Sequence, residues 1–256
     1  MTAEDVPVED PSLDGRQRVS QSRRRKHLAV WQETILLLGI ALLLAIVLKA
    51  FFLQAFHIPS RSMEPGLVEN DRILVQKVSY WGSDEPRRGD VVVFKDPGGW
   101  LGTDDSSGPR TPLARALVQV GLYPTGGHLV KRVIGVAGDV VTCCEAHGRL
   151  SVNGHALDEG DYVLPDAECA TPGTRPACRL DVGPIPDGYL FVLGDNREHS
   201  ADSTAHLCAQ DQTDCAATSG LVPVDDVVGR VFSRVWPRDR LTWVERPSAF
   251  DDVPQP

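Results

Sequence analysis

The protein has 256 residues, of which 42% are hydrophobic and 24% are charged, a balance that supports one large folded domain or two smaller ones. The same balance excludes a wholly disordered chain. The formal net charge is −9, and residues 1–30 carry six basic against five acidic side chains, so the remainder of the chain is strongly acidic. This acidic remainder argues against nucleic acid as the partner.

An apolar run follows the first 30 residues, which are rich in Asp, Glu, Ser and Arg and are predicted to form a disordered cytosolic tail. The run from Ile35 to Phe56 has 22 residues and would extend about 33 Å as a helix. We therefore predict one transmembrane anchor over residues 31–56, in which Lys49 snorkels toward the outer interface. Because basic residues precede the run, we expect a single-pass protein of the cell membrane with a cytoplasmic N-terminus and an extracytoplasmic domain.

Two other interpretations of this run fit the residues less well. A buried core helix would show a polar stripe at helical spacing, and none recurs between Ile35 and Leu48. A cleaved signal peptide would have a shorter apolar core closed by a small-x-small pair, which this run lacks. An uncleaved anchor therefore remains the better interpretation.

After Leu67 the sequence alternates short apolar segments with Gly, Pro and Asp, which predicts a mostly β domain. The expected strands are 73–78, 91–94, 129–136, 150–152, 189–193 and 227–235. Asn153-Gly154 and Pro186-Asp187-Gly188 are expected turns, because each supplies a residue that tolerates positive φ. An insertion over 96–127 contains a possible short amphipathic helix at 113–120, and no function is assigned to it.

All six cysteines follow the predicted anchor, where an oxidising environment permits disulfides; they are at positions 143, 144, 169, 178, 208 and 215. Six cysteines allow 15 pairings, which the sequence does not distinguish. Cys169 with Cys178, and Cys208 with Cys215, would each close a short loop. A metal site built from His199, His206 and nearby cysteines has no recognised ligand spacing, so we expect disulfides and no metal.

The segment Phe56-His-Ile-Pro-Ser-Arg-Ser-Met-Glu-Pro-Gly-Leu67 could present a serine nucleophile, provided that a nearby base removes its proton. None of the seven histidines lies in a motif typical of Ser-His-Asp hydrolases, and no Gly-x-Ser-x-Gly elbow is present. Lys131 is flanked by apolar strand residues, and desolvation can make such a lysine a base near neutral pH. On the strand pattern alone, a lysine on the wet face of an edge strand is the preferred interpretation.

Four segments in order change this weighing: Ile58-Pro-Ser-Arg-Ser-Met-Glu-Pro-Gly-Leu67, Arg88-Gly-Asp-Val-Val-Val-Phe94, Lys131-Arg-Val-Ile-Gly-Val-Ala-Gly-Asp139 and Gly194-Asp-Asn-Arg-Glu-His-Ser-Ala-Asp-Ser203. Behind one N-terminal anchor, they resemble the type I signal peptidases over roughly residues 30–240. The resemblance implies a serine endopeptidase that cuts signal peptides from exported preproteins at small-x-small sites. It implies a signal-peptidase-like β domain without a cofactor, over residues 57–142 and 188–245, with a disulfide-bearing cap at 143–187. Residues 246–256, beyond the resemblance, are expected to form a flexible C-terminal tail.

The resemblance also implies roles for individual residues. Ser62 matches the nucleophile and Lys131 the general base of a Ser-Lys dyad that acts through an acyl-enzyme. Ser60 matches the hydroxyl that joins the Ser62 amide in the oxyanion hole, and Ser200 matches the serine that orients the lysine. The structural supports are Arg132 with Asp195, which match an ion pair, and Asp202. Positions that match the substrate-binding surface are Phe56, Ile58, Pro59, Met63, Leu67, Leu129 and Val130.

Three positions depart from the family pattern. Arg61 stands where a glycine is common, and Gly66 stands where a threonine is usual, so the loop geometry around the nucleophile is open. Thr204 replaces an arginine that would pair with Asp202. The expected partners are signal-peptide-bearing preproteins and membrane lipid, with the protein acting as a monomer.

Two alternative functions remain. The self-cleaving repressors share this fold and chemistry, but they are soluble and carry a DNA-binding module, which the anchor and acidic balance of this chain oppose. A non-catalytic, membrane-anchored extracytoplasmic β module that binds a partner would make Ser62 and Lys131 ordinary surface residues. The reach of the chain favours a membrane protease, because the six residues from Phe56 to Ser62 extend at most about 20 Å.

Overall fold

The computed structural model describes residues 30–80, 82, 84–101, 111, 127–144, 149–165, 180–208 and 214–256. The chain divides into two units after Ala41, and the described part of the first unit belongs to α1 (Val30–Phe51). Within the described ranges, no helix combines the length and the apolar character that a bilayer crossing requires. The predicted tail at 1–30, apart from Val30, and the predicted helix at 113–120 lie outside the described residues.

The helix is shorter at its C-terminal end than the predicted anchor. It ends at Phe51, and β1 (Leu53–His57) begins two residues later, so the expectation of one helix through Phe56 is wrong. In β1, Phe56 lies opposite Ile73 of β2 (Arg72–Gln76) in an antiparallel pair. Pairing with β2 supplies backbone hydrogen bonds that a continued helix would otherwise supply, and apolar composition alone does not distinguish the two.

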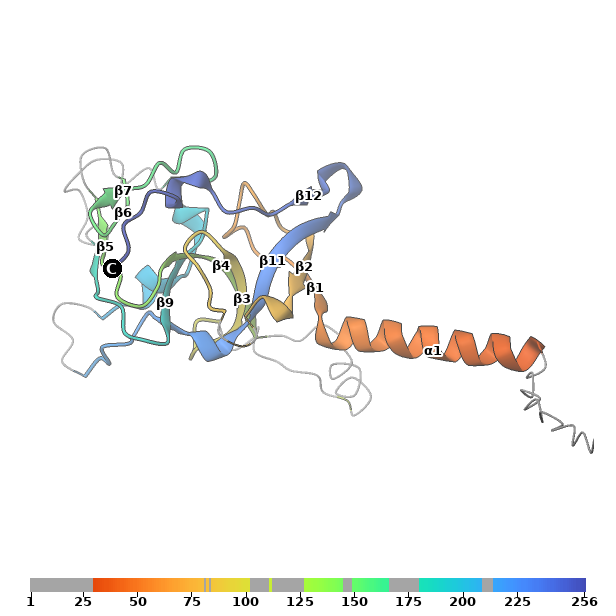
Figure 1. The fold of residues 1–256 in the computed structure, drawn as a ribbon. Coiled ribbons are helices and arrows are strands. Elements are labelled where there is room, and N and C mark those ends of the chain that lie inside the picture. The colour runs from red at the N-terminus through yellow and green to blue at the C-terminus, as the bar shows by residue number, and fades with distance from the viewer. Residues whose placement is uncertain are drawn as a thin grey trace, which may run out of the picture. The chain divides into compact units, whose positions relative to one another are not determined.

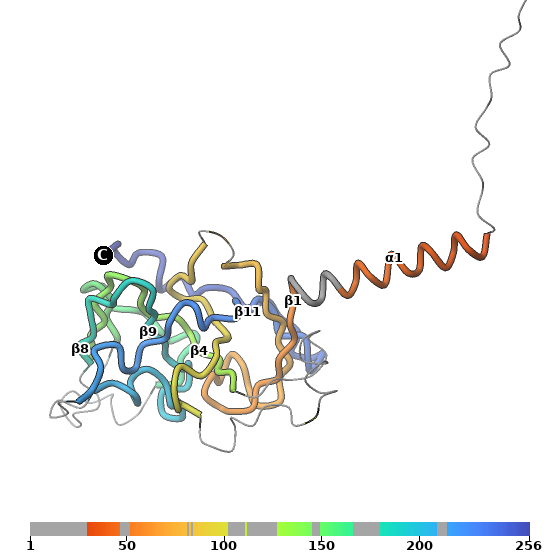
Figure 2. Tube along the Cα trace, turned by 90° about the horizontal axis from the view of Figure 1, so that it is seen from below, coloured from red at the N-terminus to blue at the C-terminus, as the bar shows by residue number. Residues whose placement is uncertain are grey.

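The second unit, residues 42–256, is mostly β, as predicted, and its main sheet has eight strands in the order β1-β2-β11-β3-β4-β9-β10 with β12 paired to β11 (Figure 1). The remaining strands of this sheet are β3 (Val91–Lys95), β4 (His128–Gly135), β9 (Tyr189–Leu193), β10 (Val222–Pro223), β11 (Val227–Trp236) and β12 (Thr242–Trp243). All of its strand pairs are antiparallel. Figure 2 shows β9, β4, β11 and β1 following one another across this unit.

A second sheet is built from the region that the sequence predicts as a cap, 143–187, extended by Val141 and Thr142 at its start. Its order is β7-β6-β5-β8, and its strands are β5 (Val141–Cys143), β6 (Ser151–Val152), β7 (His155–Ala156) and β8 (Leu180–Val182). The predicted turn joins β6 to β7, with φ of 52° at Asn153 and 77° at Gly154. One core cluster contains Val141 and Leu157 from this region together with Phe191 of β9, so the two sheets share apolar packing.

Short 3₁₀ helices connect several strands of the second unit. Their bounds are η1 (Lys77–Tyr80), η3 (Arg197–His199), η4 (Ser203–His206), η5 (Val224–Asp226), η6 (Arg238–Arg240) and η7 (Ser248–Phe250). Two of them, η3 and η4, follow β9 and carry the segment that the sequence predicts to support the active site.

The C-terminal residues are packed rather than flexible, which corrects the expectation for 246–256. Phe250 and Val253 are buried in the same core cluster as Phe191. Arg246 Nε donates to Asp90 Oδ1 at 2.6 Å, and Asn153 Nδ2 donates to the Pro254 carbonyl at 2.9 Å. Figure 1 shows the chain end beside β5. Two apolar anchors among polar residues give no periodic signal, so the sequence pattern does not reveal this packing.

Two disulfides lie in the described residues. Cys208 is bonded to Cys215, one of the two short-loop pairings that the sequence leaves open, and Cys143 is bonded to its neighbour Cys144. The other short-loop possibility, Cys169 with Cys178, lies outside the described residues.

Candidate active site

The candidate nucleophile, Ser62, lies in a closed loop between β1 and β2. The Ile58 amide donates to the Asp71 carbonyl at 2.9 Å, and the Asn70 amide donates to the Ile58 carbonyl at 2.8 Å, so these bonds join the two ends of the loop. Ile58, Met63 and Leu67 are buried in a core cluster beneath it. On the opposite side, the Ser62 carbonyl accepts from the Asn196 amide at 3.0 Å. Apolar anchors and backbone bonds therefore fix the backbone around Ser62.

Lys131 reaches Ser62 from β4, where it lies opposite Val92 of β3. Its Nζ donates to Ser62 Oγ at 2.7 Å. The two residues are only 4% and 6% exposed, so this contact is shielded from water. The structure thus joins two residues that are 69 positions apart in the chain.

Burial lowers the pKa of Lys131 to about 8 from its ordinary value of 10.5, because the ammonium form loses its hydration. The Asp202 and Asp195 carboxylates act in the opposite direction and raise this pKa, but burial dominates. Near neutral pH a substantial minority of the lysine is therefore the free amine, whose lone pair can accept the Ser62 hydroxyl proton. The surroundings of Lys131 are suited to a general base.

Ser60 lies beside the nucleophile. Its hydroxyl is 3.2 Å from Ser62 Oγ, and the residue is exposed where Ser62 is buried. A hydroxyl at this distance can rotate toward an oxygen that develops negative charge next to Ser62. The position is compatible with an oxyanion donor.

Arg132 and Asp195 form the buried ion pair that the resemblance implies. Arg132 donates from Nε to Asp195 Oδ1 at 2.7 Å and from Nη2 to Asp195 Oδ2 at 2.6 Å. Its Nη1 donates to the Gly89 carbonyl at 2.8 Å, and its guanidinium lies 4.7 Å from the ring centroid of Tyr162. The pair ties β4, next to Lys131, to the segment after β9.

Replacing Asp195 with asparagine should destabilise the fold strongly, because the Arg132 charge would remain buried without its counter-ion. We expect the free energy of unfolding to fall by about 3–5 kcal/mol in urea titrations. The matched control is Glu64→Gln, which breaks the Arg61–Glu64 pair, where Arg61 is 60% exposed. That exposed pair should contribute no more than about 1 kcal/mol. Equal losses in both variants would contradict a structural role for the buried pair.

Asp202 has no arginine partner among the described residues, and Thr204 takes part of that place. Asp202 Oδ1 accepts from the Thr204 amide at 3.1 Å and from the Thr204 hydroxyl at 2.8 Å. Asp202 Oδ2 accepts from the Gly194 amide at 2.9 Å. Neutral donors thus hold the Asp202 carboxylate, which raises the pKa of Lys131.

Ser200 does not make the expected contact in this structure. Its buried hydroxyl has no hydrogen-bond partner, so it does not bind Lys131 Nζ. Ser200 instead lies against Gly194, where an added Cβ would collide with both Ser200 Oγ and the Ser62 carbonyl. Gly194 therefore permits the close approach of these segments, a role that the sequence analysis does not assign.

The seven predicted substrate-binding residues divide into two groups. Ile58, Met63, Leu67 and Leu129 are buried in core clusters, and each is at most 8% exposed. Phe56 and Val130 are partly buried, and Pro59 is exposed. The first four therefore serve the core, which is the usual role of buried apolar side chains.

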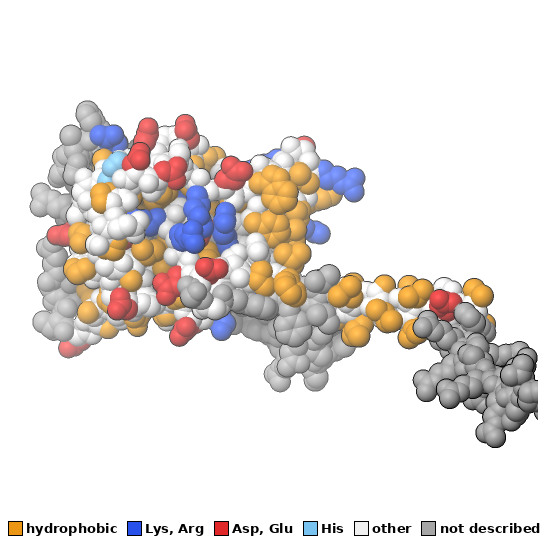
Figure 3. All heavy atoms as spheres, in the orientation of Figure 1, with side chains coloured by type: hydrophobic (Ala, Val, Ile, Leu, Met, Phe, Trp, Pro, Cys, Tyr) orange, Lys and Arg blue, Asp and Glu red, His pale blue; other side chains and the backbone are white. Residues whose placement is uncertain are grey.

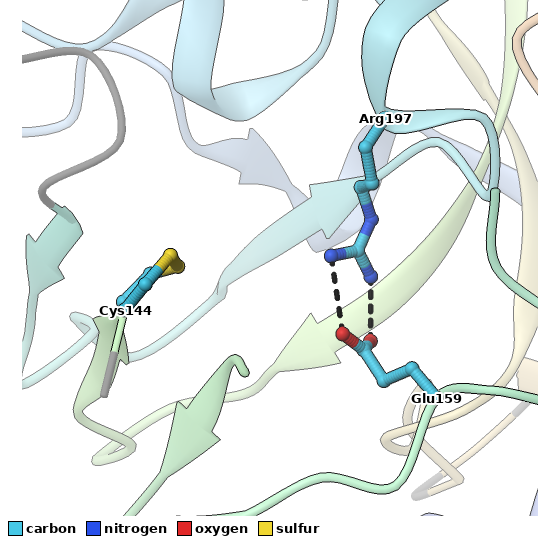
Figure 4. The surroundings of a disulfide bond; sticks show 4 residues. Cys144, Glu159 and Arg197 are labelled. Atoms are coloured by element: carbon cyan, nitrogen blue, oxygen red, sulfur yellow. Dashed lines mark hydrogen bonds and ion pairs between the residues drawn. A yellow bond between two sulfur atoms is a disulfide. The ribbon is translucent and has the colours of Figure 1, made fainter. Parts of the chain in front are cut away.

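A polar contact that no sequence motif predicts joins the predicted cap to the active-site segment. Arg197 donates to Glu159 from Nη2 at 2.5 Å and from Nη1 at 3.2 Å, and Figure 4 shows these two side chains facing each other. Arg197 Nε also donates to the Gly194 carbonyl at 3.0 Å. The two partners are 38 positions apart and stand in no motif, so only the fold reveals the pair.

Within the described ranges, His, Cys, Asp and Glu form no group of three that could hold a metal ion.

Comparison with known proteins gives consistent matches over most of the chain. Residues 31–236 match the family described as signal peptidase, peptidase S26. The chain is 38% identical over 92% of its length to the "Probable signal peptidase I" of Mycobacterium leprae (strain TN), covering 86% of that protein. It is 37% identical over 92% of its length to the "Signal peptidase I" of Mycobacterium tuberculosis (strain ATCC 25618 / H37Rv), covering 82% of it. A match at 34% identity covers 82% of the chain and 76% of the "Probable signal peptidase I-2" of Synechocystis sp. (strain ATCC 27184 / PCC 6803 / Kazusa). The chain therefore belongs to the signal peptidase family, peptidase S26, and is a signal peptidase I, a serine endopeptidase.

Proposed function

We propose that this protein is a membrane-anchored peptidase that removes signal peptides from exported preproteins by means of a Ser62–Lys131 dyad. The observation that carries the proposal is the 2.7 Å contact between Lys131 Nζ and Ser62 Oγ, with both residues buried. A surface lysine and serine of a binding module would have no reason to be desolvated together, because burying a lysine costs free energy.

The chemistry follows from this pair. The neutral Lys131 amine takes the Ser62 hydroxyl proton as Oγ bonds to the carbonyl carbon of the scissile peptide. The Ser62 amide and the Ser60 hydroxyl donate to the resulting oxyanion. When the C–N bond breaks, the Lys131 ammonium returns its proton to the leaving amine, and an ester on Ser62 remains. Water then attacks this ester, Lys131 again accepts and returns one proton, and the signal peptide leaves with a free carboxylate.

The strand arrangement supports an extended substrate. Among the described residues, β1 has a strand partner only in β2, and β4 pairs with β9 only from Arg132 onward. The Phe56 ring of β1 lies 5.4 Å from the His128 ring at the start of β4, so these two segments are neighbours. A preprotein segment that pairs with such a strand edge would bring its scissile bond toward Ser62.

Membrane attachment is proposed from the apolar run and from the surface of the catalytic unit. The described side chains of α1 are exposed and include Ile35, Leu36, Leu38 and Leu42. Trp236, Leu241 and Trp243, at the end of β11 and in the hairpin to β12, are 48%, 64% and 67% exposed. Figure 3 shows hydrophobic side chains gathered on this end of the unit. Such aromatic residues suit the interfacial region of a bilayer, and the basic segment before α1 favours a cytoplasmic N-terminus.

A preprotein with alanine at the positions one and three before the cleavage site tests this function. We expect the full chain in detergent to cleave it at one bond, because the family resemblance implies cleavage at small-x-small sites. Phenylalanine at either position should lower kcat/KM by more than about tenfold, since an oversized side chain meets packed residues. The control is the same replacement two residues before the site, which should stay within about threefold. Equal cleavage of the alanine preprotein and the three phenylalanine variants would contradict small-x-small specificity.

A further inference from the structure

One buried cation touches the loop that carries Ser62, and the catalytic scheme does not use it. Arg234 of β11 is 9% exposed and lies opposite Ile73 of β2. Its Nη1 donates to the Gly66 carbonyl, and its Nε donates to the Arg240 carbonyl at 2.5 Å. Gly66 lies in the turn that begins at the nucleophile, where the Leu67 amide donates to the Met63 carbonyl at 2.9 Å. Arg234 therefore connects this turn to the β11–β12 hairpin.

Asp71 adds a second link between the same two segments. Its carboxylate is 1% exposed, and its Oδ2 accepts from the Val68 amide at 2.9 Å. Arg240 Nη1 lies 3.0 Å from Asp71 Oδ1, and Arg234 Nη1 lies 3.7 Å from Asp71 Oδ2. Asp71 also closes the loop through its bond with Ile58. The serine loop is thus held by Asn196 on one side and by two arginines on the other.

The charge arrangement indicates a purpose other than stability. Two arginines share one buried carboxylate, and burial together with the neighbouring Arg240 lowers the pKa of Arg234. Buried charge is costly, and a hydrophobic residue of similar volume is often at least as stable. A guanidinium here gives the loop what an apolar side chain cannot, namely a directional hydrogen bond to a backbone carbonyl in the Ser62 turn.

We propose that Arg234 is a positioning residue, which holds the Ser62 loop through the Gly66 carbonyl and Asp71 so that Ser62 Oγ stays within reach of Lys131. This inference rests on the proposed dyad. It assigns a function to the Gly66 position, where the chain departs from the usual threonine, because the contact is made by the backbone carbonyl and needs no side chain. Loosening the loop should reduce the rate of the chemical step more than substrate binding, since small displacements of a nucleophile lower the rate strongly.

A cavity next to Arg234 makes the proposal open to chemical rescue. It has a volume of about 270 Å³, and its lining includes Gly66, Arg132, Asp195, Arg234 and Trp243. Truncation of Arg234 to alanine would enlarge this cavity on the side of the Gly66 carbonyl. Added guanidinium ion can then occupy the place of the missing side chain and donate to the same carbonyl and to Asp71.

The test compares Arg234→Ala with Arg230→Ala in the full chain on one preprotein. Arg230 lies on the same strand, and its partner Asp90 keeps a second arginine, Arg246. For Arg234→Ala we expect kcat to fall about 10- to 100-fold with KM changed less than about threefold. Millimolar guanidinium chloride should raise the kcat of Arg234→Ala at least about fivefold, whereas sodium chloride at equal ionic strength should not raise it. The kcat of Arg234→Lys should lie between those of the unmodified protein and Arg234→Ala, because an ammonium replaces the planar guanidinium with a point charge.

Three results would overturn the positioning role. They are an unchanged kcat in Arg234→Ala, the same loss in Arg230→Ala, and a loss in Arg234→Ala that guanidinium fails to restore. A general loss of stability would move the melting temperature and would not respond to a small cation. If the unmodified protein fails to cleave the preprotein, the proposed function itself is wrong, and that result is separate from any difference between the two arginine variants.

Discussion

Replacing Ser62 with alanine should abolish preprotein cleavage, and replacing Lys131 with alanine should do the same. The first change removes the oxygen that forms the acyl bond, and the second removes the amine that lies 2.7 Å from that oxygen. Each variant should lose at least about 10⁴-fold in kcat, measured in single-turnover assays with excess enzyme. The double variant should be little worse than either single variant, because a nucleophile and its base act as one unit.

Lys131→Arg is the sharper variant, because it keeps a positive charge at the end of a long, flexible side chain. A guanidinium does not lose its proton near neutral pH, so it cannot serve as the base. The matched control is Lys95→Arg on β3, at an exposed position, which should leave kcat within about twofold. Substantial turnover by Ser62→Ala, by Lys131→Ala or by Lys131→Arg would contradict the dyad and favour a different nucleophile or base.

The sequence predicts the β class and most main-sheet strands, because short apolar segments bounded by Gly, Pro and Asp are typical of buried strands between turns. The segment 189–193 agrees with β9, and 91–94 falls within β3. Short strands such as β5, β7 and β10 were not predicted, since two or three residues carry no periodicity. The sequence predicts a helix over most of β1, because these residues continue the preceding apolar run, and apolar composition does not distinguish helix from strand.

The site divides in the same way. Ser62, Lys131 and the Arg132–Asp195 pair could be predicted because they stand in motifs, and the structure brings each pair within 2.7 Å. The contacts of Arg234, Asp71, Glu159 and Arg197 could not, because their partners depend on how distant segments pack. The orientation of Ser200 is also a packing property. A motif specifies which residue stands at a position, whereas the direction of its hydroxyl depends on neighbours such as Gly194.

The pH dependence of cleavage should identify the base. With a Lys131 pKa of about 8, kcat/KM should rise about tenfold per pH unit below that value and level off above it. The sign follows from the chemistry: acid keeps the lysine as an ammonium, which has no lone pair, so activity disappears as the pH falls. At pH 7 about a tenth of the lysine would be neutral, compared with less than about a thousandth at the ordinary lysine pKa. Full activity at pH 5 would contradict a lysine base.

A substitution at Asp202 should shift the pH profile of kcat/KM in a direction that follows from the structure. Asp202 raises the pKa of Lys131, so Asp202→Asn should lower it and move the ascending limb toward acid. The asparagine oxygen can still accept from Gly194 or Thr204, which limits damage to the fold. The control is His199→Gln, at an exposed residue of η3, which should leave the limb in place because an imidazole does not supply the base. A shift toward alkaline pH in Asp202→Asn, or loss of the limb in His199→Gln, would mean that the titrating group is not Lys131.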